Sequence, residues 1–198
     1  MLKVYFIRHG ETYGNTLKRY IGVTDESIRA ESVKVIQNKR YPRVDFIYMS
    51  PLKRCCETAA IIYPEQPLSK LDDLKECDFG DFENKNYQEL ADNDDYQKWI
   101  DSNATLPFPN GEDMKIFRKR CEDIFIGIIN QSLAKDFKQI AIVTHGGVIM
   151  AIMERFNQIK QEFYEWLPNN GEGYEVQIDK NNWLKELKVS GTSKLKYE

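Results

Sequence analysis

Three stretches of the sequence share one pattern, in which a short apolar run ends in polar residues or glycine and a helix-like segment follows. The runs are residues 4–7 (VYFI), 46–49 (FIYM) and 140–144 (IAIVT). None of them alternates apolar with polar residues, and such runs are typical of parallel strands that are covered on both faces. The pattern predicts an α/β fold with three layers, in which a mostly parallel central sheet lies between two layers of helices.

The segments between these runs predict the covering helices and one excursion. Residues 29–38 and a longer stretch from Met114 onward repeat apolar residues at helical spacing. Residues 64–110 break the strand-helix rhythm, because they begin with two prolines and contain a helix predicted around residues 87–100. We expect this stretch to form a lid or small subdomain over the strand ends.

The C-terminal part predicts additional edge strands. Residues 174–178 alternate apolar with polar side chains, and a polar turn separates them from residues 183–189. This arrangement favours a terminal hairpin.

The chain length and composition limit the possible function classes. With 198 residues, the chain is expected to form a single domain (1–198) that carries the insertion at about 64–110. A net charge of −3 gives no general attraction to nucleic acid or to anionic membranes. The N-terminus lacks a leader pattern, and no run approaches membrane-spanning length. We therefore expect no nucleic-acid or membrane partner, and the oligomeric state is left open.

The cysteines and histidines argue against a metal site. The four cysteines have no C-x-x-C spacing and only two histidines accompany them, so we expect no metal and interpret the cysteines as reduced thiols in a cytoplasmic protein. Cys55 and Cys56 are interpreted as helix-packing residues.

Both histidines directly follow a predicted strand and directly precede a glycine. If the three strands are neighbours, Arg8, His9, Arg54 and His145 meet at the carboxyl edge of the sheet, where α/β proteins bind ligands. Arginine binds phosphate bidentately, so two arginines there indicate an anion site, and Gly146 would let backbone N–H groups approach it. Structural roles remain open for each residue alone, for example an Arg54–Glu57 ion pair.

Five sequence blocks resemble the histidine phosphatase superfamily, the phosphoglycerate mutase-like clan. The blocks are RHGETYGN at 8–15, SPLKRCCETA at 50–59, LKECDFGDFE at 74–83, PNGED at 109–113 and VTHGG at 143–147. Their order and spacing are those of the family, and the form of the third block is most similar to small alpha-ribazole and broad-specificity phosphatases. The resemblance implies a phosphoglycerate mutase-like fold.

The resemblance also implies a phosphohistidine mechanism that needs neither a metal nor a cofactor. His9 would be the nucleophile, and Glu76 would be the general acid that protonates the leaving oxygen. Phosphoryl oxygens would be bound by Arg8, Asn15, Arg54, His145 and Gly146. Asp78, Asp81 and Glu83 remain rivals of Glu76 for the acid role, while Glu11 and Thr12 are expected in turn or capping roles.

Three functions remain open at this stage. The first is a phosphomonoesterase for small phosphorylated metabolites, with alpha-ribazole 5'-phosphate as the first candidate substrate. The others are a cofactor-dependent phosphoglycerate mutase, which is an isomerase, and a non-catalytic phosphate-binding module. The short, acidic stretch from Cys77 to Gly111 favours the phosphatase, because basic residues would be needed to bind a glycerate.

Two features bear on the substrate. Asn84 and Asn110 replace glycines that the family usually has at these positions. Several aromatic residues either form a wall for a ring-bearing leaving group or pack in the core, namely Tyr13, Tyr20, Phe79, Phe82 and Tyr87.

Overall fold

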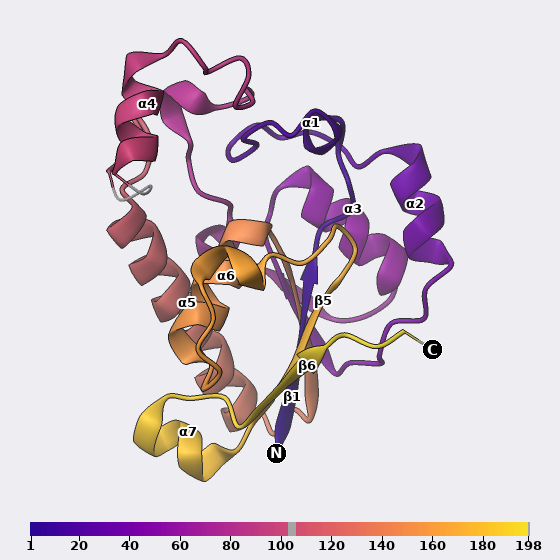
Figure 1. Cartoon of the computed structure of the whole chain (residues 1–198). Coiled ribbons are helices and arrows are strands. Elements are labelled where there is room, and N and C mark those ends of the chain that lie inside the picture. The colour runs from indigo at the N-terminus through magenta and orange to yellow at the C-terminus, as the bar shows by residue number, and fades with distance from the viewer. Residues whose placement is uncertain (103–105, 198) are drawn as a thin grey trace.

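The structure is a computed structural model that describes residues 1–102 and 106–197. It contains one six-stranded sheet (Figure 1). The predicted insertion and domain also include residues 103–105 and Glu198, which lie outside the described residues. The strand order is β3-β2-β4-β1-β5-β6, and only β5 runs against the others. The strands are β1 (Leu2–Arg8), β2 (Phe46–Met49), β3 (Leu68–Lys70), β4 (Gln139–Thr144), β5 (Gly173–Ile178) and β6 (Gly191–Lys194). The predicted mostly parallel α/β fold is confirmed.

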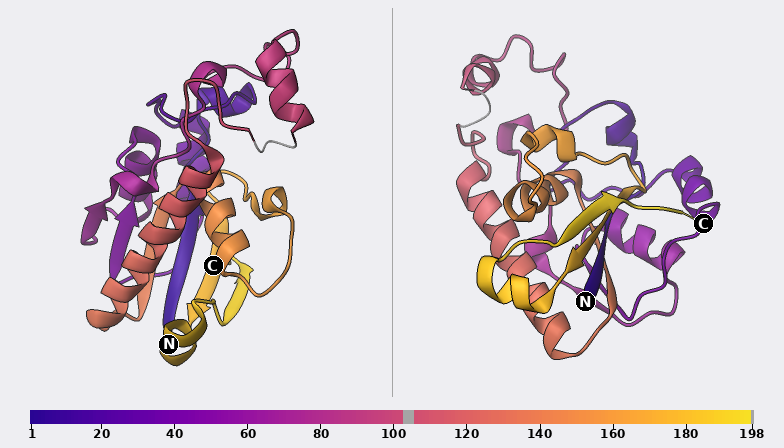
Figure 2. Two further views of the ribbon diagram at one scale, coloured as in Figure 1. Left: turned by 90° about the vertical axis from the view of Figure 1, so that its left-hand side faces the viewer. Right: turned by 60° about the horizontal axis from the view of Figure 1, so that its bottom comes forward.

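Helices cover both faces of the sheet, because successive strand residues point to opposite sides. Val4 and Phe6 of β1 pack in one core, whereas Tyr5 and Ile7 pack in the other. Figures 1 and 2 show α5 and α6 on the first face and α2 and α3 on the second. The helices on the two faces are α2 (Ala30–Gln37), α3 (Lys53–Ile62), α5 (Met114–Ala134) and α6 (Gly146–Phe156). None of the helices in the described ranges is long and apolar enough to cross a membrane.

The predicted C-terminal hairpin is wrong in its second strand. Helix α7 (Lys180–Glu186) follows β5, and the pairing strand β6 comes after it. Asp179 begins the helix by accepting hydrogen bonds from the backbone N–H groups of Asn181 and Asn182. Trp183 then packs edge-on against Phe125, so this segment contributes to the core through a helix rather than a strand.

The segment predicted as an excursion also differs in part. Strand β3 lies inside residues 64–110 and extends the sheet beside β2. The predicted helix begins only at Asp94, after the capping residue Asn93, so Tyr87 is outside it and exposed. Figure 1 shows α4 (Asp94–Asp101) beyond the carboxyl ends of the strands. The remaining short elements are α1 (Tyr13–Thr16) and the 3-10 helices η1 (Asp72–Leu74), η2 (Gly80–Phe82) and η3 (Phe163–Trp166).

Candidate active site

The two histidines meet because β1 and β4 are parallel neighbours in register. Arg8 at the end of β1 lies opposite Thr144 at the end of β4, so His9 and His145 are the next residues on the two strands. Their ring centroids are 5.2 Å apart, and both side chains are buried. The same edge of the sheet receives Arg54 from the first turn of α3.

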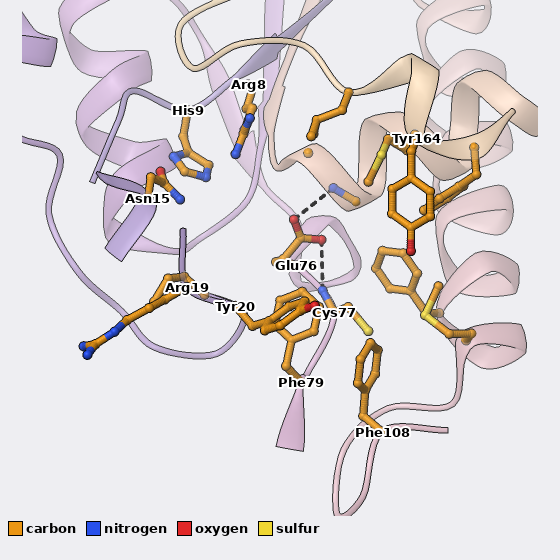
Figure 3. Close-up of a pocket in the computed structure, with 18 of the residues that line it drawn as sticks. Arg8, His9, Asn15, Arg19, Tyr20, Glu76, Cys77, Phe79, Phe108 and Tyr164 are labelled. Carbon is orange, nitrogen blue, oxygen red and sulfur yellow. Dashed lines mark hydrogen bonds between the residues drawn. The ribbon is translucent and has the colours of Figure 1, made fainter. Parts of the chain in front are cut away.

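A cavity of about 230 Å³ opens beside Arg8 and His9. Figure 3 shows how residues that line it are arranged. Of the residues predicted for the site, Arg8, His9, Asn15, Glu76 and Gly146 line the cavity. Arg54 and His145 are fully buried and are not among the residues that line it; the His145 ring contacts the His9 ring.

His9 is held as a neutral imidazole with one free nitrogen. Its Nδ1 lies 2.8 Å from the carbonyl oxygen of Gly10. A carbonyl only accepts hydrogen bonds, so Nδ1 carries the proton and Nε2 keeps its lone pair. Burial, followed by the positive charges of Arg54 and Arg8, holds the pKa of His9 well below its usual value. This is the state that a nucleophilic histidine requires.

The backbone after His9 is fixed from α3. The N–H of Gly10 donates to Thr58 Oγ1 at 2.8 Å, and the Thr58 hydroxyl donates to the carbonyl of Arg54. Thr58 thereby fixes the His9–Gly10 peptide. The next peptide, whose carbonyl holds the His9 ring, is fixed by the Glu11 N–H, which donates to Ser32 Oγ at 2.7 Å.

In the guanidinium of Arg8, one terminal nitrogen has a hydrogen-bond acceptor, whereas Nε has none among the described residues. One terminal nitrogen donates to the carbonyl oxygen of Pro168 at 2.8 Å. Nε is buried and has no hydrogen-bond partner among the described residues. An unpaired buried donor of a charged group is costly, and an anion bound beside His9 would satisfy it.

Arg54 and His145 are bound to each other next to His9. Arg54 Nε donates to His145 Nδ1 at 3.2 Å, and its terminal nitrogens donate to the carbonyls of Ile21, Gly22 and Thr24. His145 Nδ1 is therefore an acceptor, and its Nε2 donates to Ser50 Oγ at 2.8 Å. Burial and the charge of Arg54 lower the pKa of His145 well below its usual value, so this ring is neutral as well.

Asn15 presents its amide nitrogen to the cavity. Asn15 and Thr12 form a capping box at the N-terminus of α1, so Thr12 has the capping role that was expected of it. Its Oδ1 accepts from the Thr12 N–H and from Asn170 Nδ2, both at 3.1 Å. With both acceptor directions engaged, the Asn15 side chain is left with its two N–H groups as donors for a ligand.

Glu76 lies across the cavity from His9, Arg8 and Asn15 (Figure 3). Its carboxylate accepts hydrogen bonds from the Gly147 N–H at 2.9 Å and the Cys77 N–H at 3.1 Å. Burial raises the pKa of Glu76, and this effect exceeds the opposing effect of those two hydrogen bonds. A Cβ at position 147 would lie 2.4 Å from Glu76 Oε1, so the close approach requires glycine there.

The three rival acids have other contacts and do not line the cavity. Asp78 accepts from the Gly80 N–H, and Asp81 accepts from the side-chain amide of Asn110. Glu83 accepts from the N–H groups of Gly22 and Thr24. Of the four acids, Glu76 alone reaches the cavity.

The opposite part of the cavity is aromatic. From the predicted aromatic set, only Tyr20 and Phe79 line it; Tyr13 and Tyr87 are exposed, and Phe82 is buried in the core. The sequence analysis missed the other aromatic lining residues, which are Trp99, Phe108, Phe117, Phe163 and Tyr164. They lie in α4, in the loop after it, in α5 and in η3, so no local sequence motif contains them.

Arg19 also lines the cavity but does not offer its charge to it. Its guanidinium donates to both carboxylate oxygens of Glu89 and, as Figure 3 shows, points away from Glu76 and His9. The aromatic part of the cavity therefore contains no free cation among its described lining residues.

Asn84 and Asn110, which stand where the family usually has glycine, adopt a left-handed backbone conformation that is common for glycine. Asn84 and Asn110 both have φ of 56°, in the left-handed region. Asparagine tolerates this region better than most residues, so both replacements keep the backbone turn.

The loop Pro168–Gly171 was not predicted as part of the site. Besides the contacts of Pro168 and Asn170 already described, Asn170 Nδ2 donates to the His9 carbonyl at 3.1 Å, and the Gly171 N–H donates to the Arg8 carbonyl at 3.0 Å. Gly171 has φ of 68°, which glycine adopts readily. The sequence PNNG at 168–171, shortly before β5, is typical of a turn and was the one local sign of this loop.

Comparisons with known proteins agree with this geometry. The model of the histidine phosphatase superfamily (branch 1) matches residues 4–189. The chain is 27% identical over 197 residues to the adenosylcobalamin/alpha-ribazole phosphatase of Escherichia coli, covering 95% of each chain. The alpha-ribazole phosphatase from Shigella flexneri has a similar structure, with a TM-score of 0.79, 23% identity and coverage of 99% of this chain and 95% of that one.

A phosphoglycerate mutase from Bacillus anthracis also shares the fold. Its TM-score is 0.70 at 21% identity, over 88% of this chain and 87% of that one. Phosphatases and a mutase thus have the same architecture, so the fold alone does not distinguish the two reactions.

Proposed function

Because the chain belongs to the histidine phosphatase superfamily (branch 1) and is a phosphatase, we propose that it hydrolyses small phosphomonoesters through a phosphohistidine on His9. The observation that carries this proposal is the state of His9. Its Nδ1 donates a hydrogen bond to the Gly10 carbonyl at 2.8 Å, which leaves the lone pair on Nε2. Arg8 lines the same cavity, and its buried Nε has no partner among the described residues.

In the first step, His9 Nε2 attacks phosphorus and the bond between phosphorus and the ester oxygen breaks. Arg8, the amide of Asn15 and Gly146 bind the phosphoryl oxygens from the cavity wall, and the buried Arg54 and His145 next to His9 stabilise the charge that gathers on the phosphoryl group. The leaving oxygen receives the proton of Glu76, whose raised pKa favours the acid form.

In the second step, Glu76 acts as the base. Its carboxylate takes a proton from water, the water oxygen bonds to phosphorus, and the bond from phosphorus to His9 breaks. Inorganic phosphate leaves, and both residues return to their starting states. Charge stabilisation by the arginines replaces the role that Mg²⁺ has in other phosphoryl-transfer enzymes.

The aromatic part of the cavity favours a ring-bearing leaving group with little charge. Tyr20, Phe79 and Phe108 present apolar surface there, and Arg19 is bound to Glu89. A glycerate carboxylate in the aromatic part of the cavity would find no free cation among the described residues that line that part, which argues against a mutase. Alpha-ribazole 5'-phosphate, the substrate in the names of two relatives, is the first candidate.

The deciding experiment supplies two sets of compounds to the purified protein. One is a panel of nucleoside and sugar monophosphates that includes alpha-ribazole 5'-phosphate; the other is 3-phosphoglycerate with 2,3-bisphosphoglycerate. We expect phosphate release from the panel and a phosphoryl group on His9 after rapid acid quench. Rapid isomerisation of the glycerate without phosphate release from the panel would refute the phosphatase assignment.

A further inference from the structure

A second, larger hollow lies on the face of the sheet that α2 and α3 cover. It has a volume of about 810 Å³, and none of its lining residues is shared with the active cavity. Tyr5 and Gln139 of the sheet line it together with the C-terminal end of α2, the loop after that helix and the end of α3. Figure 1 shows the C-terminal segment beside this loop. We call this hollow the basic groove.

Positive charge predominates in the basic groove, although the chain as a whole carries a net charge of −3. Its cationic lining residues are Lys3, Lys39, Arg40, Arg43 and Lys196, and its single carboxylate is Glu175. Glu175 pairs with Lys3 at 3.3 Å, and Lys39 pairs with Glu172 at 3.1 Å. Asp45 and Glu65 line two smaller hollows that share Arg43 with the groove.

Three of these cations have no carboxylate partner among the residues that the structure describes. Arg40, Arg43 and Lys196 are exposed and form no ion pair with any residue in the described ranges. Like charges on one hollow repel each other and attract counter-ions of high charge. An anion with several charges would therefore gain more here than at scattered surface lysines.

The groove also offers apolar surface to the carbon part of a ligand. Tyr41, Pro42, Ile61 and Ile62 line it next to the cations. We propose that the basic groove binds a small organic polyanion with at least two phosphate groups and an apolar or ring-bearing part. Its volume accommodates a ligand of nucleotide size.

The groove is joined to the catalytic residues by the loop Pro168–Gly171 and the adjoining Glu172. From the groove side, the Tyr41 hydroxyl donates to the Gly171 carbonyl at 2.8 Å, and Lys39 pairs with Glu172. From the other side, the same loop binds the backbones of Arg8 and His9. A polyanion that draws Lys39 away from Glu172 weakens one anchor of this loop, so occupancy of the groove changes the turnover number.

Binding is tested with adenosine 5'-(β,γ-methylene)triphosphate, which cannot release its terminal phosphate by hydrolysis. Orthovanadate first saturates the active cavity, and titration calorimetry then measures binding of the nucleotide analogue. We expect a Kd of about 1 mM or lower that rises with salt. The double variant Arg40→Gln/Arg43→Gln should weaken binding at least about tenfold, since it removes two of the unpaired charges.

A matched control removes two charges elsewhere. Lys34 and Lys180 are exposed and lie outside the groove, so Lys34→Gln/Lys180→Gln should bind like the parent protein. No binding by the parent protein, or equal binding by both double variants, would overturn the proposal.

The link to catalysis is tested with p-nitrophenyl phosphate. The analogue should change kcat in the parent protein and in the lysine control, but not in Arg40→Gln/Arg43→Gln. A change in KM alone would mean competition in the active cavity, and it would overturn the link. If no phosphatase activity is found at all, the binding measurement still decides whether the groove binds polyanions.

Discussion

The two ends of the active cavity are built from different interactions. At the phosphate end, His9, Arg8 and Asn15 have hydrogen-bond partners of defined direction, mostly on the backbone. At the other end, aromatic rings contact each other edge to face. The ring centroids of Phe79 and Phe108, for example, are 5.1 Å apart. Directional contacts fix reacting atoms, whereas ring packing selects a shape. Substitutions at the phosphate end should therefore lower kcat, and those at the aromatic end should change KM and selectivity.

The largest effect is expected for His9→Ala. Loss of the nucleophile should lower kcat for p-nitrophenyl phosphate by roughly 10⁴-fold or more. The circular dichroism spectrum should stay unchanged, because removing a small ring at the cavity wall leaves both cores intact. Substantial residual turnover, combined with complete loss in His145→Ala, would mean that the nucleophile is the other histidine.

Glu76→Gln should have the next largest effect, and it should depend on the leaving group. Loss of proton donation should slow alkyl phosphates by roughly 10²- to 10⁴-fold, whereas an aryl oxide leaves without a proton and needs less help. The measurement compares kcat/KM for glycerol 2-phosphate and p-nitrophenyl phosphate. Asp81→Asn is the matched control, because Asp81 contacts Asn110 and not the cavity. Equal slowing of both substrates would exclude Glu76 as the general acid.

The pH profile should follow from the two shifted groups. Glu76 must be protonated for the first step, so kcat/KM for alkyl phosphates should fall about tenfold per pH unit above its raised pKa. His9 must be neutral, and its lowered pKa keeps it so well into the acid range. No decline centred near pH 6.5 is therefore expected on the acid side. In Glu76→Gln the alkaline decline should disappear; its persistence would assign it to another group.

A smaller effect is expected for Asn170→Ala. This side chain orients Asn15 and holds the His9 carbonyl, so its loss should lower kcat about tenfold with little change in KM. Asn169→Ala is the control, since the neighbouring side chain donates its hydrogen bond to Glu172 and, among the described residues, makes none to Asn15 or His9. A rise in KM alone in Asn170→Ala would show that the loop contributes to binding rather than to positioning.

The smallest effect is expected at the aromatic end. Phe79→Leu should raise KM several-fold for ring-bearing substrates such as nucleoside monophosphates and leave glycerol 2-phosphate unchanged. Tyr13→Leu provides the control, because Tyr13 is exposed and outside the cavity. If Phe79→Leu lowers kcat for both substrates equally, the two ends of the cavity are not functionally distinct.

The same contrast explains what the sequence could predict. Arg8 ends one buried strand, and His9 and His145 directly follow two buried strands, so strand prediction also placed these three residues in space. Asn15 and Glu76 came from short motifs. The aromatic end is formed by residues such as Tyr20, Phe108 and Tyr164, which are far apart in the chain and meet only through tertiary packing.

The errors have local physical causes. The segment after β5 contains apolar residues that fit a strand, but the side chain of Asp179 caps a helix there. The helix of the insertion begins late because Asn93 provides its cap, and the turns before it are held by Asn86. Capping competes with hydrophobic periodicity at short range, and periodicity alone does not show which one prevails.

The strand order has a consequence for how the chain folds during synthesis. Strand β1 is made first, yet its two neighbours, β4 and β5, begin at Gln139 and Gly173. Until β4 (Gln139–Thr144) has left the ribosome, the apolar segment VYFI has no partner strand on either side. An unpaired hydrophobic strand of this kind is prone to aggregate and depends on contacts that are distant in sequence. Truncated or stalled chains of this protein should therefore need chaperone protection of their first ten residues.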